Sequence, residues 1–161
     1  VYKKIPHNWT VQYNTKYEQQ YDGGGADGLI DGIHGTVNWR KGNWQGYQLT
    51  DMDVKIDLKM LRPVSKIKLG FLQDSRSWII MPKQVQIESS TDGIKYSPLY
   101  SGKDYLYIED EEPQIMILEP SFPAITARYL RIKAVQYGKL PAWHLGAGGD
   151  SHIFIDEIEI D

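Results

Sequence analysis

The chain has 161 residues, 41% of them hydrophobic, which is enough to form a core in a single domain spanning residues 1–161. It has no cysteine, which excludes disulfides and cysteine-based zinc or thiol chemistry, and no run of about 18 apolar residues, so we expect no membrane span. The net charge is −3, with 18 basic and 21 acidic residues interspersed, which argues against nucleic acid and an anionic membrane surface as partners.

The composition of the first part of the chain predicts a loop. Its opening residues, VYKKIPHNW, hold no apolar signal core, as expected for a mature domain or a piece of a longer protein. The stretch LIDGIHGTVNWRKGNWQGYQ (29–48) is too rich in glycine for a helix and lacks the alternation of a strand. We therefore expect a loop that carries Trp39, Trp44 and Tyr47.

Alternation with a period of two then predicts a series of short strands. The residues that share a face in each run are Val54, Ile56 and Leu58; Ile67, Leu69 and Phe71; Val85 and Ile87; Ile115 and Ile117; and Leu130, Ile132 and Ala134. Turn signals separate the runs at 62–63, 91–93 and 119–120. The Asp-Gly pair within SSTDGIKY (89–96) predicts a hairpin.

The last run, HIFIDEIEID (152–161), changes phase along its length. Ile153 and Ile155 share one phase, and Ile158 and Ile160 share the other. A β-bulge at 156–157 is the usual cause of such a slip. The bulge either aims a side chain for a purpose or merely bends the strand. Many short strands with turns between them predict an all-β fold, a sandwich or a barrel.

The ordered motifs of the chain resemble those of the discoidin domain, also called the coagulation factor V/VIII type C domain. They are L-x-D-G followed by Thr and Trp (29–39), V-x-I-D-L (54–58), S-x-D-G (90–93), A-R-Y-L-R-I (127–132) and E-I-x-I (157–160). The resemblance implies an antiparallel jelly-roll β-sandwich of the galactose-binding-domain-like type.

Within that superfamily, the chain looks closest to carbohydrate-binding module family 32. Three stretches, at 31–48, 70–85 and 141–158, are similar to the C-terminal domains of Bacteroides-type β-N-acetylhexosaminidases, or chitobiases. The resemblance implies a non-catalytic module of a bacterial glycoside hydrolase, located in the periplasm, at the cell surface or outside the cell. Its partners would be a glycan and the parent catalytic domain, and we expect a monomer.

The resemblance also implies a structural calcium ion (Ca2+) held by Asp31, Thr36 and Glu157, with the backbone carbonyl of Ile33 where many relatives have an acidic residue. Calcium takes about six to eight oxygen ligands, and a glycine-rich loop can turn carbonyls inward. An ion between Asp31 and Glu157 would clip the first loop to the last strand. The alternative is that Asp31 makes an Asp-Gly turn and that Glu157 is solvated.

Three loops combine aromatic rings with polar side chains, at 39–47, 73–78 and 137–152. A sugar site needs an aromatic plane for the C–H face and polar partners for the hydroxyls, and loops on a rigid scaffold often carry such sites. The candidate ligand-binding residues are Trp44, Gln45, Asp74, Arg76, Trp78, Trp143 and His144.

Each candidate also has a structural explanation. Trp44 and Trp78 could plug the ends of the sandwich, Arg76 could pair with Asp74, and His144 could be a buried, hydrogen-bonded histidine. Trp39 matches a tryptophan that is usually core in this fold, so it is left out of the candidate site.

The motifs do not favour an enzyme. None of the four histidines has the spacing of a metalloprotease motif, no G-x-S-x-G elbow occurs, and GGGADG lacks the Lys-Ser/Thr of a phosphate loop. Two functions remain. The first is a module that binds glycans with galactose- or N-acetylhexosamine-type ends. The second is a structural or protein-interaction domain that packs against its catalytic domain.

Overall fold

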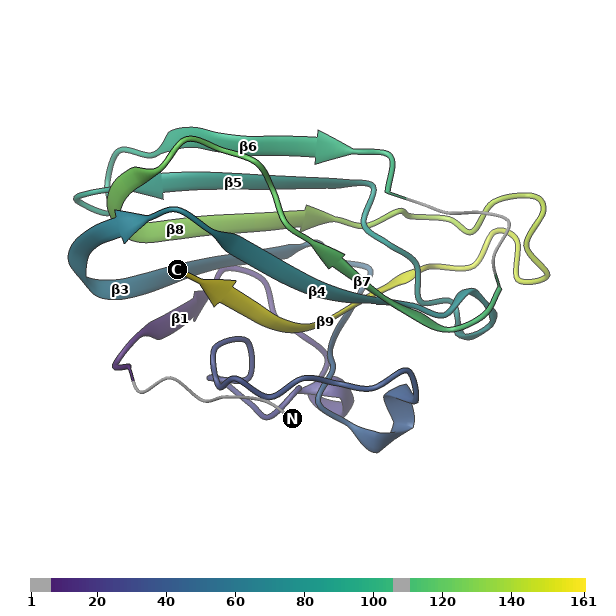
Figure 1. Cartoon of the computed structure of the whole chain (residues 1–161). Helices are drawn as coiled ribbons and strands as arrows, with labels where there is room; N and C mark the ends of the chain where they lie inside the picture. Colours follow the sequence, from purple (N-terminus) through teal and green to yellow (C-terminus); the bar gives the residue numbers. More distant parts are fainter. Residues whose placement is uncertain (1–6, 106–110) are drawn as a thin grey trace.

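A computed structural model of the chain describes residues 7–105 and 111–161 and shows two antiparallel sheets that face each other (Figure 1). The five-stranded sheet has the order β1 (Thr10–Tyr13), β3 (Met52–Val64), β8 (Ile125–Val135), β5 (Gln84–Ser90) and β6 (Ser97–Lys103). The four-stranded sheet has the order β2 (Gln45–Gln48), β9 (His152–Ile160), β4 (Ile67–Gln73) and β7 (Gln114–Leu118). The predicted all-β jelly-roll-like sandwich is confirmed.

Helix is nearly absent from the described residues. Three single turns of 3-10 helix lie in the loops: η1 (Gln19–Tyr21), η2 (Trp39–Lys41) and η3 (Ser75–Ser77). Within these parts of the chain, no helix has the length and apolar character needed to cross a membrane.

The core lies between the two sheets, where alternate residues of each strand point inward. The alternation predicted the inward residues of four strands correctly, and all of them are buried: Val54, Ile56 and Leu58 of β3; Ile67, Leu69 and Phe71 of β4; Val85 and Ile87 of β5; and Leu130, Ile132 and Ala134 of β8.

Strand β7 has the opposite phase from the prediction. Ile115 and Ile117 are 40% and 65% exposed, whereas Met116 and Leu118 pack against the core. All four residues are apolar, so their sequence satisfies either phase. The outer face of the sheet is open to solvent at β7, so Ile115 and Ile117 are exposed there.

Two predicted loop boundaries are also wrong. The expected turn at 62–63 lies inside β3, where Pro63 pairs with Thr126 of β8. Proline is tolerated there because β1 pairs with β3 only over 54–57, so none of the described strands lies on the other side of Pro63. The expected loop 29–48 ends in strand β2, whose pairing with β9 buries Tyr47.

The β5–β6 hairpin and the bulge in β9 agree with the sequence. Gly93 has φ +78° in the turn after β5. Leu69 pairs with Ile158 and Phe71 with Ile155, so Gly70 alone faces the two residues at 156–157. The bulge lets the isoleucines on both sides of it, at 153, 155, 158 and 160, point into the core.

Loops cover part of the outer face of the four-stranded sheet. Trp44, Leu72, Ile79 and Phe154 form a second buried cluster there, and Tyr21 and Trp39 pack against it. The first loops of the chain are therefore anchored on the sheet rather than free in solvent.

Candidate functional site

The carboxylates of Asp31 and Glu157 meet where the first loop crosses the last strand. The Gly32 N–H donates to Glu157 Oε2 at 2.8 Å, and the Ile33 N–H donates to Asp31 Oδ1 at 2.9 Å. Glu157 is buried, and its Oε1 has no hydrogen-bond partner. Burial raises the pKa of Glu157 to about 9 despite the hydrogen bond from Gly32, and the charges of Asp31 and Asp156 add to the increase.

This donor set fits a hard cation. An orphaned buried carboxylate oxygen is costly unless something compensates it, and a divalent ion would do so. No three His, Asp or Glu side chains gather to hold a metal within the described ranges, so the other ligands would be neutral oxygens. The Thr36 hydroxyl has a different partner in this structure, donating to the Asn38 carbonyl at 3.3 Å.

A second link between the first loop and β9 was not predicted. Asp156 is buried, and its Oδ2 accepts from the Gly35 N–H at 3.1 Å and lies 3.2 Å from His34 Nδ1. The other ring nitrogen of His34 lies 2.9 Å from Glu159 Oε1. Burial raises the pKa of Asp156 to about 6, although His34 opposes the increase. The phase slip in the sequence was the one signal that marked Asp156.

Four of the predicted ligand residues, Trp44, Gln45, Asp74 and His144, are buried, and for Trp44 and Gln45 this corrects the prediction most clearly. Trp44 is only 2% exposed, and its Nε1 donates to the Thr36 carbonyl at 2.8 Å. Gln45 is fully buried, donates to the Tyr13 hydroxyl at 3.0 Å and accepts from the Tyr47 hydroxyl at 2.8 Å. Neither side chain offers an exposed aromatic or polar surface to a ligand, because the loop before β2 folds back over the sheet; Trp44 contributes only the 2% of its surface that remains accessible.

Asp74 lies in a chain of hydrogen bonds that joins two of the predicted loops. The Ser77 hydroxyl donates to Asp74 Oδ2 at 3.1 Å and accepts from Trp39 Nε1 at 3.1 Å. The exposed side chain of Arg76 reaches Glu111 at 3.4 Å instead of Asp74. The structure thus brings the loops 39–47 and 73–78 together through Trp39, a residue left out of the predicted site.

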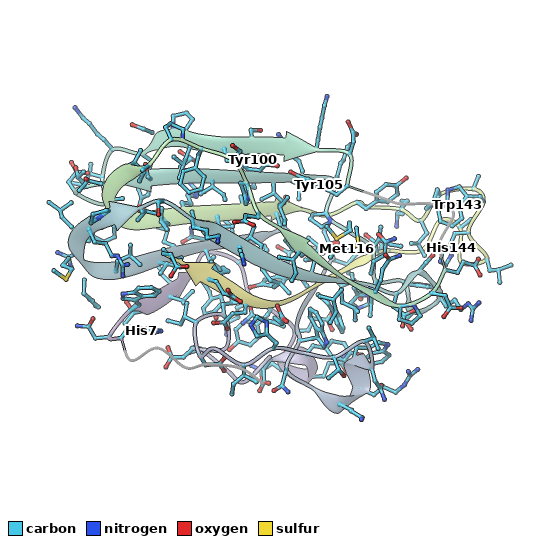
Figure 2. All side chains as sticks on the ribbon, in the orientation of Figure 1. His7, Tyr100, Tyr105, Met116, Trp143 and His144 are labelled. Carbon is cyan, nitrogen blue, oxygen red and sulfur yellow. The ribbon has the colours of Figure 1, made fainter. Side chains whose placement is uncertain are left out.

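The third loop, at 137–151, forms the tip of the sandwich, where Figure 2 labels Trp143 and His144. His144 is buried: its Nδ1 accepts from the Gly146 N–H at 2.8 Å, so Nε2 carries the proton and donates to the Ser75 carbonyl at 2.6 Å. This is the structural explanation weighed for His144, and it corrects the prediction of a ligand contact.

Two predicted tryptophans keep part of their rings exposed at this tip. Trp143 is 43% exposed and Trp78 is 38% exposed, with the fully exposed Leu145 in the same loop as Trp143. Trp78 packs so closely against the loop that a Cβ atom at Gly146 or Gly149 would come within 2.7 Å of its ring. Trp78 therefore has a fixed orientation.

A cleft of about 220 Å³ lies between the loop at 19–23 and the loop at 38–44; we call it the end cleft. Its lining combines aromatic rings with amide, carboxylate and guanidinium groups. The residues that carry these groups are Gln20, Tyr21, Asp22, Trp39, Arg40 and Asn43, and Trp44 lies at its base. None of the first six was among the predicted ligand residues.

Local contacts hold the turn η2 and the two aromatic rings of the end cleft. The Asn38 side chain caps η2 by accepting from the Arg40 N–H at 3.2 Å. Tyr21 meets Trp39 edge to face, with 5.7 Å between ring centroids. The Arg40 guanidinium lies 4.4 Å from the centroid of the Trp39 ring. The signal for this cleft was present in the motif WRKGN, but Trp39 was assigned to the core.

The fold and the chain's sequence define its family. Residues 10–148 match the F5/8 type C domain, and the chain belongs to this family. No curated protein matches the sequence.

Similar solved structures include several binding modules. CBM32-1 from a family 31 glycoside hydrolase of Clostridium perfringens has a TM-score of 0.61 at 15% identity, covering 99% of this chain and 97% of that one. Chitosan-binding module 1 from a Paenibacillus sp. IK-5 chitosanase/glucanase has a TM-score of 0.60 at 14% identity, and the match covers 99% of this chain and 98% of that one. CpGH89CBM32-5 of C. perfringens, solved with GalNAc-β-1,3-galactose, has 0.57 at 15%, covering 94% of each chain. The domain thus resembles non-catalytic carbohydrate-binding modules.

Proposed function

We propose that this domain is a carbohydrate-binding module whose ligand binds at the end cleft and against the exposed rings beside it. The observation that carries the proposal is the composition of the cleft, where half-buried aromatic rings stand beside carboxylate, amide and guanidinium groups. Small-molecule sites typically combine an apolar wall with a few convergent polar groups. A sugar ring matches this set because it has an apolar C–H face and directional hydroxyls.

The cleft residues take distinct roles in this mechanism. The edges and free faces of Tyr21 and Trp39 contact the C–H groups of the sugar. Asp22 and Asn43 exchange hydrogen bonds with its hydroxyls or acetamido group, and Arg40 donates to its oxygens. Because Tyr21 and Trp39 pack against each other and against the second buried cluster, these two rings lose little side-chain freedom on binding.

The ligand class that we propose is a glycan with a galactose- or N-acetylhexosamine-type end. Its support is the structural neighbour solved with GalNAc-β-1,3-galactose. We propose further that the module serves a β-N-acetylhexosaminidase of the chitobiase type, as the similar stretches of sequence imply. Trp78, Trp143 and Arg76 at the tip would extend the contact beyond the terminal sugar.

We propose that the Asp31–Glu157 pair holds a structural Ca2+. A bound ion would neutralise the two carboxylates and supply a partner for the orphaned Glu157 oxygen. The Ile33 carbonyl and the Thr36 hydroxyl are the neutral ligands expected from the family resemblance. The role is structural because the pair ties the first loop to β9.

Binding of GalNAc-β-1,3-galactose and of N-acetylglucosamine oligomers, measured by calorimetry, tests the proposed site. We expect Arg40→Ala and Asn43→Ala each to weaken binding about tenfold, the effect of roughly 1.4 kcal/mol. Lys41→Ala is the matched control, because Lys41 follows Arg40 in η2 but does not line the cleft. Equal affinity of all three variants and the unchanged protein would refute the cleft as the site.

A second function is favoured by the apolar tip. Trp78, Trp143 and Leu145 expose apolar surface together at one end of the sandwich, as expected of a surface that packs against a neighbouring catalytic domain. A glycan array without any signal, combined with tight binding of a separately produced catalytic domain, would favour this function.

A further inference from the structure

A second polar groove lies on the outer face of the five-stranded sheet. Residues of β1, β3 and β8 line it, together with the turn between β5 and β6, and we call it the sheet groove. It encloses about 240 Å³, far more than the roughly 30 Å³ that one water occupies. The β5–β6 turn is at the left end of the sandwich in Figure 1, whereas the loop at 137–151 is at the right end. The sheet groove and the end cleft share no lining residue.

The pairing of the strands gathers polar side chains in the groove. Val54, Ile56 and Leu58 point into the core, so the residues between them, Lys55 and Asp57, point outward. The antiparallel register places Gln12 and Thr10 of β1 opposite these two residues. On the other side of β3, Tyr129 of β8 pairs with Asp57. Amide, hydroxyl, ammonium and carboxylate groups therefore lie side by side.

Two tyrosines stand in the groove with fixed orientations. The Lys55 ammonium lies 5.3 Å from the centroid of the Tyr96 ring, and the Arg128 guanidinium lies 4.9 Å from that of Tyr129. Tyr129 also packs on the turn, where a Cβ atom at Gly93 would come 3.1 Å from its ring. The Asp-Gly motif thus turns the hairpin and also leaves room for Tyr129. Phenols held in this way lose little freedom when a ligand binds.

The charges of the groove nearly balance. Arg128 donates to both oxygens of Asp57, at 3.0 and 3.2 Å, and the carboxylate of Asp92 accepts from the backbone N–H groups of Ile94 and Lys95. No carboxylate pairs with Lys55 in the described part of the chain, so its ammonium is available as a donor. The described residues that line the groove include two tyrosines but no large aliphatic side chain.

We propose that the sheet groove is a second carbohydrate-binding site, one that takes the interior of a neutral polysaccharide. The mixed hydrogen-bond donors and acceptors match the hydroxyl groups of a sugar. Because the charges nearly balance, the groove does not favour an anionic polysaccharide. A groove along a sheet face also leaves both ends of the polysaccharide free to extend beyond it. The ligand class rests on the proposed function, but the location does not. With the end cleft, the domain would have two separate sites that share no lining residue.

The test is an NMR titration of the whole 161-residue chain with two neutral probes, chitotetraose and cellotetraose. We expect at least one probe to shift the amide signals of Gln12, Lys55 and Tyr96. Lys55→Ala should weaken this response about tenfold, whereas Lys133→Ala, on the neighbouring strand β8, should leave it unchanged. Tyr96→Phe removes one hydroxyl and keeps the ring, so it serves as a second variant should larger changes unfold the domain.

The same spectra separate the two sites. Shifts around Arg40 and Asn43 alone, with probe concentrations on the order of 10 mM, would overturn the sheet groove and support the end cleft. Shifts at the groove that persist in Arg40→Ala would support the groove whatever the fate of the end cleft. If Lys133→Ala weakens the probe-induced shifts as much as Lys55→Ala does, the proposed groove contacts are wrong. Unchanged spectra with both probes would also overturn the groove.

Discussion

Burial separates the tryptophans of this domain into two kinds, although their sequence contexts look alike. Trp44 and Trp143 both lie in glycine-rich loops with polar neighbours. Trp44 is part of a buried cluster and donates to a backbone carbonyl, whereas Trp143 has its ring half in solvent. The same substitution should therefore have opposite kinds of effect at the two positions.

We expect Trp44→Ala to lower the free energy of unfolding by about 3–5 kcal/mol, because it leaves a cavity in a packed cluster. Trp143→Ala should change it by no more than about 1 kcal/mol, as usual for an exposed position. Denaturant unfolding of both variants measures the difference. Similar stabilities for the two would contradict the burial of Trp44.

Gly70 shows how one small residue permits the bulge. A Cβ atom there would lie only 2.1 Å from Asp156 Oδ1, so the carboxylate fills the space above the glycine. We expect Gly70→Ala to destabilise the domain by about 1–3 kcal/mol, the usual range for overpacking. A thermal melt with a double-mutant cycle checks the cause, since Asp156→Ala should remove most of the added penalty. Additive effects would show that the two residues do not meet.

At the scale of elements, the core strands could be predicted from the sequence and the loops could not. Alternation identifies the inward face where apolar and polar residues alternate, as in β3 and β8. It fails in β7, where four apolar residues in a row allow both phases. The end cleft was missed because Gln20, Tyr21 and Asp22 come close to Arg40 and Asn43 only through packing on the four-stranded sheet. No local pattern encodes that approach.

The ion pair between Asp53 of β3 and Arg131 of β8 makes the stability of the domain depend on pH in acid. Burial alone would raise the pKa of Asp53, but hydrogen bonds from Arg131, at 2.8 and 3.0 Å, and from Asn14 hold that pKa below its usual range. A carboxyl whose pKa is lower in the folded state stabilises the fold above its unfolded pKa, about 3.9, and the stabilisation is lost as the pH falls through the folded value.

We expect Asp53→Asn to lower the free energy of unfolding at pH 7 by about 1 kcal/mol, because Arg131 is partly solvated and the pair is screened. The difference between variant and parent should shrink as the pH falls below about 3.9, the usual Asp pKa, and through the lowered pKa of Asp53. Unfolding curves at stepped pH values measure this. A difference that stays constant into acid would show that Asp53 does not titrate below its usual range.

At the scale of the whole molecule, the contacts between the first loop and β9 close the fold. Asp31 and Glu157 belong to segments 126 positions apart, and the Gly32–Glu157 hydrogen bond has nearly the same span. The family resemblance was needed to predict that these residues meet, since nothing in their local sequence relates them. A ligand that bridges such a contact stabilises the folded state alone.

We therefore expect added calcium to raise the melting temperature relative to chelator. At a calcium concentration about 100 times the dissociation constant, the gain is about 2.7 kcal/mol. For a domain of this size, that corresponds to a shift of about 5–10 °C. Differential scanning calorimetry measures the shift, and Asp31→Ala and Glu157→Ala should each abolish it. Identical melts with calcium and with chelator in the unchanged protein would refute the calcium site.

The position of β9 sets the order in which the domain can assemble during synthesis. It is the last strand of the domain, yet it lies between β2 and β4, and Asp161, the residue that follows it, exchanges backbone hydrogen bonds with Lys66. Until β9 leaves the ribosome, β2 has no strand to pair with, and the carboxylates that fasten the first loop are absent. Loop closure over so many residues is slow, so the nascent chain exposes the apolar face of β4 until β9 has been synthesised and has paired with it.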